Sequence, residues 1–499
     1  MGTQTANGDS PLSELSFWPR VREFAVPASM IETATTRRLA GDWAGACAAA
    51  GVDVDLSLRS VARDHGRDVA ARVRADLRHL APDLLRWHLP RIAPDGLLRP
   101  GLTLALARYE GVGRDTGRPL QLVARTPPAW ADAGQRISLA LWGGPRAGAA
   151  AGGEDGAWRH PHPRPNRRFR LDLHRHLWDA SRAGELRIRS GASGGGLPAR
   201  DQPGLDPEEP ALLGRTSLYG RRCAVDRWAD EARILLRAEG RSEGALLVRL
   251  GGRHRLVLEL LGGGNGDGGG DGGDGRSGGS SVLRISAATK GRARALPVLP
   301  DAATWVLPDL ELLRAGAIEA GGLHPLVAAA LVPDQAPPTR PSRPSPNPDP
   351  AGQPRLVECR GAQHRIGLVD GVLTPLDHDP AETRREELLA ALTGTPLPCL
   401  QAIDEAHRHP ACLPDVRERL WHGDTAGALA VVEGLLGPDA VLRDGALRDE
   451  LEAAARQRIT YGLFRAGLAG PGPARRGFDA DERGRPRDHR ARPRHATFP

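Results

Sequence analysis

The sequence contains a single lysine. Lys290 is the one lysine among 68 Lys and Arg residues, so the other 67 are Arg. A P-loop needs Gly-Lys-Ser/Thr, whereas Lys290 lies between Thr289 and Gly291, which excludes a classical Walker-type NTPase. The chain also lacks the Val-Ala-Ile-Lys, His-Arg-Asp and Asp-Phe-Gly motifs, which argues against a protein kinase.

Cysteines and long apolar runs are also scarce. The five cysteines are odd in number, far apart and never in a Cys-x-x-Cys pair, so a disulfide framework is a poor interpretation. The first 16 residues are polar, without the apolar core of a secretory signal. No run of about 18 apolar residues could span a bilayer. We therefore expect a cytoplasmic protein with reduced thiols and no membrane partner.

Aromatic residues number only 19, whereas Gly (62) and Pro (43) make up about a fifth of the 499 residues. An ordinary chain has roughly an eighth. The excess lies in blocks that are predicted not to pack, which are residues 1–28, 143–167, 192–212, 262–280, 333–354 and 468–499. At 40% hydrophobic residues, the remaining chain can still bury a sizeable core.

The pattern predicts an α+β protein with a helical N-terminal module, a strand-rich antiparallel middle, a helical C-terminal module and long disordered linkers. The predicted divisions are a disordered N-terminus (1–28), a helical module (29–95), a strand-rich α+β domain (100–332) with flexible insertions near 143–167, 192–212 and 262–280, a Pro-rich linker (333–354), a hairpin plus C-terminal helical domain (355–467) and an Arg-rich disordered tail (468–499).

Apolar periodicity places the elements. Val69, Val73, Leu77 and Leu80 form one stripe of a helix that ends near Leu80, and a second short helix follows up to Pro90. Further helices are expected at 225–236, 308–318, 325–331 and 447–463. Strands are expected at 102–109, 120–125, 137–142, 169–173, 185–188, 245–250, 255–261, 282–286, 356–359 and 365–369.

One sequence pattern occurs twice, at residues 41–48 and 423–430. Both copies begin Gly-Asp and continue with small residues. The pattern predicts a joint between two helices, in which Gly closes the first helix and the Asp side chain caps the second. It looks like the turn of tetratricopeptide-type helical hairpins, but no 34-residue period continues from either copy. An ordinary helical hairpin is therefore the simpler interpretation.

The densest group of metal-ligand residue types is Cys399, His407, His409 and Cys412, within 14 residues. Zinc favours four such ligands in a tetrahedron. The spacing matches no common zinc finger, and a helix over 400–408 would point the two histidines apart. A partly buried Cys pair with exposed His is favoured over a metal site.

Two further histidine groups stand beside carboxylates. If residues 169–174 form a strand, Asp172, His174 and His176 share one face of it for as long as the strand continues. A solvent-facing side of a sheet explains that pattern equally well. The segment 377–379, Asp-His-Asp before Pro380, indicates turn chemistry and capping of the next helix, and a catalytic role would need a third group.

The tail carries eight Arg against four acidic residues, a net +4 of the chain's total of +7. Such an arm could bind nucleic acid through phosphates. Its two aromatic residues, Phe478 and Phe498, serve base stacking poorly, and the interleaved acids dilute the attraction.

No motif supplies a nucleophile, a base and an orienting group together, and none indicates a cofactor. The leading hypothesis is a non-catalytic interaction or regulatory protein that binds a protein partner through helical surfaces. A second hypothesis is an enzyme, for example a metal-dependent hydrolase, with a site assembled from distant residues. A third is a nucleic-acid-associated protein that acts through the tail. A deep cleft with converging titratable side chains would count against the leading hypothesis.

Overall fold

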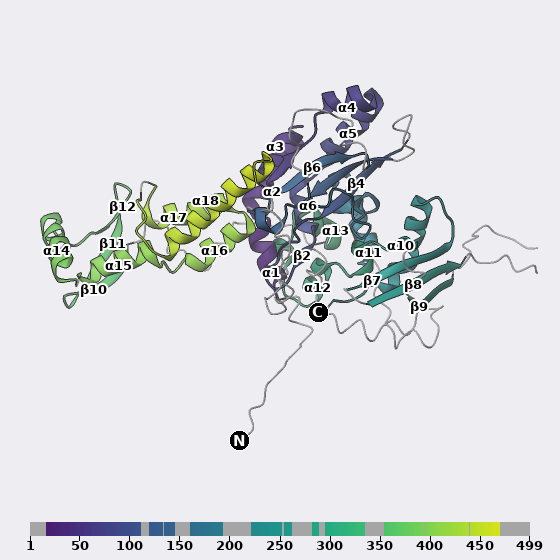
Figure 1. Cartoon of the computed structure of the whole chain (residues 1–499). Helices are drawn as coiled ribbons and strands as arrows, with labels where there is room; N and C mark the ends of the chain where they lie inside the picture. Colours follow the sequence, from purple (N-terminus) through teal and green to yellow (C-terminus); the bar gives the residue numbers. More distant parts are fainter. Residues whose placement is uncertain are drawn as a thin grey trace, which may run out of the picture. The chain divides into compact units, whose positions relative to one another are not determined.

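The computed structural model describes residues 16–110, 119–132, 134–144, 160–192, 221–251, 254–261, 282–288, 295–334, 354–394, 396–438 and 440–469. The chain forms two compact units. The first comprises residues 1–130, 137–338 and 474–499, and the second comprises residues 131–136 and 339–473. The chain therefore passes from the first unit to the second within the Pro-rich segment 333–354. The architecture is α+β, with helices towards both ends and small, mainly antiparallel sheets between them (Figure 1).

The main sheet of the first unit has the strand order β1-β6-β5-β4. Its strands are β1 (Val52–Val54), β4 (Thr103–Tyr109), β5 (Leu120–Arg125) and β6 (Ile137–Trp142). The last three are antiparallel neighbours at the predicted positions, because their apolar runs are bounded by turn residues. The edge strand β1 pairs in parallel with β6, which the sequence did not indicate.

Helices of the N-terminal region pack on this sheet rather than forming a module of their own. They are α1 (Trp18–Arg20), η1 (Val21–Ala25), α2 (Ala28–Leu39), α3 (Trp43–Ala49), α4 (Leu58–His65), α5 (Arg67–His79) and α6 (Pro82–His88). Val73 and Leu77 of α5 share one buried core with Leu104 and Leu122 of the sheet. The boundary expected near residue 95 therefore does not separate two folding units.

The predicted disordered N-terminus also needs correction. Residues 18–25 form α1 and η1, and Val21 is buried in the same core as the sheet. A polar and Pro-containing sequence is ordered here because Arg22 finds a buried partner far along the chain, described below. Pro82 begins α6, and Pro90 follows its end, so the predicted interruption of the helical stripe is confirmed.

A second core in the first unit lies between a three-stranded antiparallel sheet and a helix. The strands are β7 (Gly244–Leu250), β8 (His254–Leu261) and β9 (Val282–Ala287), and the helix is α10 (Val225–Ala238). All four were predicted within two residues at each end. Trp228 of α10 is fully buried against Leu246 and Leu258 of the sheet (Figure 1).

Two predicted strands are wrong. Residues 169–173 and 185–188 instead form short helical turns, which are η3 (Leu171–Leu173), η4 (Arg175–Leu177), η5 (Ala180–Glu185) and α8 (Leu186–Arg189). The fully buried Trp178 donates its indole N–H to the Leu171 carbonyl oxygen at 3.0 Å. Asp179 caps the turn that follows it. These local bonds and this burial satisfy the segment without a strand partner, which alternation alone cannot reveal.

The first unit closes with further short elements. They are β2 (Arg91–Ile92), β3 (Leu97–Leu98), η2 (Ala129–Ala131), α11 (Asp301–Thr304), α12 (Pro308–Arg314), η9 (Ala320–Gly322) and α13 (Pro325–Leu331). Helix α13 lies where the sequence predicted it, and α12 ends four residues earlier than expected, since Gly316 takes a positive φ of 64°.

The second unit joins a small antiparallel sheet to five helices. The sheet has the order β10-β11-β12, with β10 (Arg355–Cys359), β11 (Ala362–Val369) and β12 (Val372–Pro375). The helices are α14 (Pro380–Thr393), α15 (Pro398–Arg408), α16 (Leu413–His422), α17 (Thr425–Leu436) and α18 (Ala446–Arg465). The hairpin and the helical region were both predicted in this order.

The repeated Gly-Asp pattern forms the same joint in both units. Gly41 and Gly423 take positive φ angles of 79° and 90°. The Asp carboxylates then cap α3 and α17 by accepting hydrogen bonds from the Gly45 and Gly427 amides at 2.8 and 2.9 Å. A Cβ atom at Gly45 or Gly427 would collide with the capping carboxylate, which accounts for the glycine in each copy. The predicted joint is confirmed.

Each joint also includes an arginine five residues before the Asp, which lies outside the repeated sequence pattern. The backbone carbonyls of Arg37 and Arg419 accept hydrogen bonds from the Asp42 and Asp424 amides at 2.9 and 2.8 Å. Their guanidinium groups bond the same carboxylates at 3.0 and 2.9 Å. One Asp therefore connects the end of one helix to the start of the next.

None of the described helices combines the length and the apolar character needed to cross a membrane.

The joint in the second unit generates a stability prediction. We expect Asp424→Ala to lower the free energy of unfolding by about 1 kcal/mol, since an N-cap and its Arg419 contact are lost. Asp424→Asn keeps a capping oxygen and should cost clearly less. Urea unfolding followed by circular dichroism measures both variants. Equal losses in Ala and Asn would show that the cap is not the source.

Candidate functional site

A cavity lies in the first unit, where its two cores meet. Its volume is about 160 Å³. Phe17, Trp87 and Phe169 line it from one core, and Trp305 lines it from the other. The chain therefore surrounds a space with apolar and aromatic walls in the middle of the unit.

Arginines dominate the polar lining of this cavity. Eight arginines line it, against two acidic residues, Asp301 and Glu311. The arginines are Arg22, Arg91, Arg99, Arg168, Arg170, Arg189, Arg221 and Arg227. Several of them are paired with carboxylates around the lining, so the balance of charge has to be followed one residue at a time.

Arg22 is deeply enclosed. Its side chain is 3% exposed and forms an ion pair with the fully buried Asp309, at 2.9 Å. The guanidinium group also donates to the Trp87 carbonyl oxygen at 2.7 Å and stacks on the rings of Trp18 and Trp87. Trp87 in turn donates its indole N–H to Asp309 at 3.2 Å. This arginine is balanced.

Arg91 and Arg227 are less well balanced. Arg91 is buried, and among the described residues it hydrogen-bonds backbone carbonyl oxygens alone, those of Gly96 and Arg86. Burial, with the positive charges of Arg86 and Arg22, lowers its pKa well below the usual value. Arg227 reaches Glu231 only at 3.9 Å. Burial also lowers the pKa of the Arg227 guanidinium.

Glu231 is already occupied by stronger partners. It accepts hydrogen bonds from Arg189 at 2.7 Å and from His174 at 3.1 Å. Burial opposes its ionisation, but these two partners hold the pKa of Glu231 well below its usual range. The cavity therefore keeps an excess of positive charge beside Arg91 and Arg227.

Two histidines complete the lining, and each has one ring nitrogen without a hydrogen-bond partner among the described residues. These atoms are Nε2 of His88 and Nδ1 of His176. Burial lowers the pKa of both imidazoles well below 6.5, and the positive charges of Arg22 near His88 and of Arg189 near His176 add to the effect. Both rings are therefore neutral at pH 7, because the surrounding charge is already positive.

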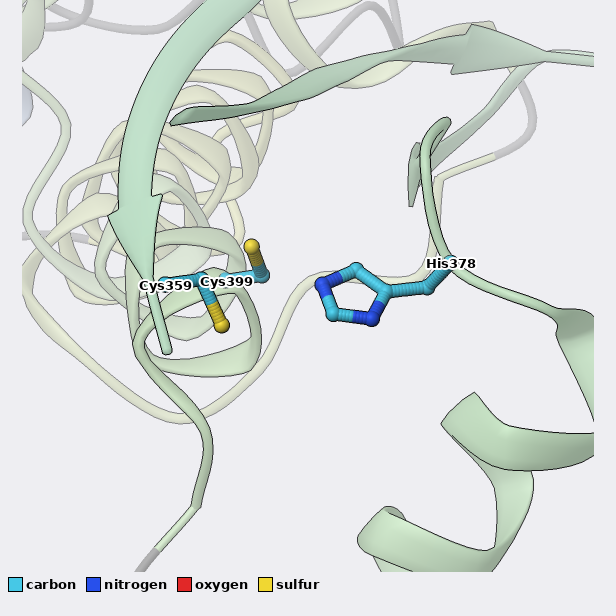
Figure 2. Close-up of side chains that lie close together, drawn as sticks. All are labelled: Cys359, His378 and Cys399. Carbon is cyan, nitrogen blue, oxygen red and sulfur yellow. The ribbon is translucent and has the colours of Figure 1, made fainter. Parts of the chain in front are cut away.

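The second unit contains a separate cluster of metal-ligand residue types. Among the described residues, Cys359, His378 and Cys399 form the one group of at least three such side chains whose ligand atoms all lie within 4.8 Å of one another. Both cysteines are buried. Figure 2 shows the His378 ring pointing at the two sulfur atoms from the opposite side. Three donors thus face one space.

Each member of this cluster comes from a different element. Cys359 is the last residue of β10, and His378 follows β12. Cys399 is in the first turn of α15. The His364 ring stacks on that of His378 with centroids 4.3 Å apart, which restrains the orientation of the ring.

The structure does not bring the predicted set Cys399, His407, His409 and Cys412 together as ligands. Cys399 and His407 lie at opposite ends of α15, which separates them by about 12 Å along the axis. Cys412 lies against a different apolar cluster from Cys399, and His409 is exposed. Of the four, only Cys399 belongs to the cluster that the fold creates.

The suspected face of Asp172, His174 and His176 does not exist, because residues 169–174 form no strand. Asp172 is held by the Arg170 guanidinium, with contacts of 2.8–3.1 Å. His174 lies between Glu231 and the Arg170 carbonyl oxygen. Of the three, His176 alone lines the cavity. Asp379 caps α14 through the Ala381 amide, which confirms the capping prediction for 377–379.

Most of the functional candidates were missed from sequence. Arg91 and Arg227 look like ordinary surface arginines in a chain with 67 of them. Cys359 and His378 lie 40 and 21 residues before Cys399, far outside any short motif. The only available signal was that Cys359 directly precedes a predicted turn at Gly361, where a hairpin would fix its position.

No family model, no curated protein and no solved structure matches this chain. The case for function therefore depends on the geometry alone.

The buried histidines generate a pH prediction for the first unit. His88 and His176 have lowered pKa values, and burial lowers that of His160 to about 4. A histidine with a lowered folded pKa binds fewer protons than the unfolded chain, so stability falls as the pH drops below about 6.5. His160 alone can account for roughly 3 kcal/mol of this loss. Glu311, whose pKa burial raises, acts in the opposite direction but is a single group.

Urea unfolding followed by tryptophan fluorescence between pH 7.5 and 5 measures this effect. The midpoint should fall with pH, and His176→Gln should flatten the dependence. A midpoint that stays constant or rises as the pH falls would contradict neutral, buried histidines.

Proposed function

We propose that this protein is a non-catalytic regulatory protein whose first unit binds a small organic anion. The ligand combines a phosphate or carboxylate group with an apolar part. The observation that carries the proposal is the cavity of about 160 Å³ with eight arginines and two acidic residues in its lining.

The charge of the lining supports an anionic ligand. A buried cation without a charged partner costs several kcal/mol, and an opposite charge in the same space offsets that cost. In the described part of the chain, Arg91 bonds backbone carbonyls, and Arg227 is 3.9 Å from a carboxylate that already binds two stronger partners. A phosphate or carboxylate can accept bidentate hydrogen bonds from guanidinium groups.

The size and walls of the cavity support a ligand with an apolar part. An engineered apolar cavity of roughly 150 Å³ in another protein binds benzene. Here Trp18, Phe169 and Trp305 contribute aromatic surface beside the arginines. A single aromatic ring that carries one anionic group matches both properties.

Binding can be tested with phenyl phosphate and inorganic phosphate as probes. We expect phenyl phosphate to stabilise the first unit by about 2.7 kcal/mol at a concentration 100 times its Kd, and phosphate to bind more weakly. Phenol, which lacks the anion, should not stabilise the unit. Thermal unfolding and calorimetry measure these effects.

Two matched substitutions on α10 test the position of the site. Arg227→Gln removes a cavity arginine, whereas Arg233→Gln changes an exposed arginine that pairs with Asp230. Affinity should fall at least tenfold in the first variant and stay unchanged in the second. Equal affinities in both variants, or equal binding of phenol, would refute the proposal.

The binding should strengthen as the pH falls from 8 to 6. An anion in the cavity raises the pKa of His88 and His176, so the complex takes up protons. Calorimetry in buffers of different ionisation enthalpy measures that uptake. Proton release on binding would contradict this arrangement.

A specific feature of the second unit supports the protein-partner part of the hypothesis. Helix α14 has no buried residue, and its Leu388, Leu389 and Leu392 are 63%, 50% and 85% exposed. Three exposed leucines within about one helical turn form an apolar patch of the kind that marks protein contacts. The helix-mediated partner remains a proposal supported by this patch.

The partner proposal is testable by comparing capture with the intact chain and with a Leu388→Asp/Leu392→Asp variant. Proteins enriched by the intact chain and lost with the variant would support the α14 surface. An unchanged set of captured proteins would remove α14 as the docking face.

The enzyme and nucleic-acid hypotheses gain less support from the structure. The enzyme hypothesis had Asp172, His174 and the 399–412 residues as its suspects, and these lie in ion pairs or apart from one another. The nucleic-acid hypothesis depends on the Arg-rich tail, and the tail from residue 470 onward lies outside the described residues.

A further inference from the structure

We propose that Cys359, His378 and Cys399 bind one zinc ion in the second unit, and that this ion has a structural role. The inference is independent of the anion site, because these residues belong to the second unit and the cavity to the first.

The spacing of the three ligand atoms fits zinc. Zinc binds thiolate sulfur at about 2.3 Å and imidazole nitrogen at about 2.0 Å in a tetrahedron, which places ligand atoms about 3.5–3.8 Å apart. The three atoms here lie within 4.8 Å of one another without a metal. A shift of about 1 Å by each side chain would close the shell.

The chemistry of the donor set selects zinc over the hard cations. Two sulfur atoms and one imidazole are soft or borderline ligands, whereas magnesium and calcium prefer oxygen. Asp377, the carboxylate directly before His378 in the sequence, is held by hydrogen bonds from the Arg365 amide and guanidinium. Water completes the fourth position in this arrangement.

The ligand atoms are oriented and available. Nε2 of His378 is buried without a hydrogen-bond partner in the described part of the chain, and the ring points at both sulfur atoms (Figure 2). Cys359 is fixed by the hairpin turn that follows it, in which Arg360 and Gly361 both take positive φ angles. Arg360 also forms ion pairs with Glu382 and Glu386 of α14.

The structural role follows from the small size of the surrounding core. The buried cluster between the β10–β12 sheet and α15 consists of Cys359, Ile366, Cys399 and Ile403. Four side chains, two of them cysteines, bury little apolar surface, and small cores of this kind are commonly stapled by a metal. A zinc ion at this point connects the end of β10, the segment after β12 and the start of α15.

The test uses the full-length protein, purified in the presence of a reductant. We expect about one zinc per chain by elemental analysis, and exchange with cobalt(II) should give the thiolate-to-cobalt absorption of a tetrahedral site. Cys359→Ser, Cys399→Ser and His378→Gln should each lower the zinc affinity at least tenfold. Cys412→Ser and His409→Gln are the matched controls and should keep the metal.

A second measurement does not depend on the variants folding. With zinc bound, Cys359 and Cys399 should resist alkylation, and a chelator should expose them, while Cys412 reacts equally in both states. Peptide mass mapping identifies the modified residues. The same chelator should lower the melting temperature of the second unit.

Four results would overturn the proposal. They are a wild-type protein that binds neither zinc nor cobalt, a cobalt spectrum without thiolate absorption, zinc retained in both Cys→Ser ligand variants, and a Cys359–Cys399 disulfide in protein kept reduced. Loss of zinc in Cys412→Ser but not in Cys399→Ser would also overturn it, in favour of a different set of ligands.

Discussion

The first unit depends on how its interior accommodates positive charge. The pair of Arg22 and Asp309 joins residues 287 positions apart and is buried on both sides. Removing one partner of such a pair typically costs 3–5 kcal/mol, because the remaining charge stays behind without compensation. The tryptophans that stack on Arg22 or bond Asp309 extend the same contact into the apolar core. Around this balanced pair the fold leaves a cavity in which Arg91 has no carboxylate partner among the described residues, and the neutral histidines are a consequence of that field.

The second unit depends on local connections, because its apolar clusters are smaller. The Asp424 joint fixes the angle between α16 and α17, and Asp379 caps α14. Ion pairs within and between helices, such as Arg417 with Glu450, add to these contacts at the surface, where each is worth little. The cluster at Cys359, His378 and Cys399 is the one place where metal-ligand side chains converge in the described part of this unit. A unit of this kind holds its elements by defined points of contact, so a metal at one such point has a large effect on stability.

Repetition in sequence and repetition in structure coincide at the Gly-Asp joints. The joints of residues 41–48 and 423–430 have the same backbone bonds and the same capping bond, and an arginine five residues before the Asp in both. Residues 169–173 show the opposite case, since their alternation matched a strand but Trp178 and Asp179 organised short helical turns instead. Local signals predicted elements well where a cap or a proline fixed the boundary. They failed where a distant side chain decided the outcome.

The sequence by itself determined the α+β class, most of the strands and helices, the two capped joints and the passage between units in the Pro-rich segment. These follow from periodicity, turn residues and capping, which act over a few residues. Only the tertiary structure decided that Arg22 meets Asp309, that Arg91 and His176 line one cavity, and that Cys399 lies beside Cys359 and His378 rather than His407 and Cys412. The reason is that these contacts join residues separated by tens to hundreds of positions, and such pairings are set by how whole elements pack, which no local pattern encodes.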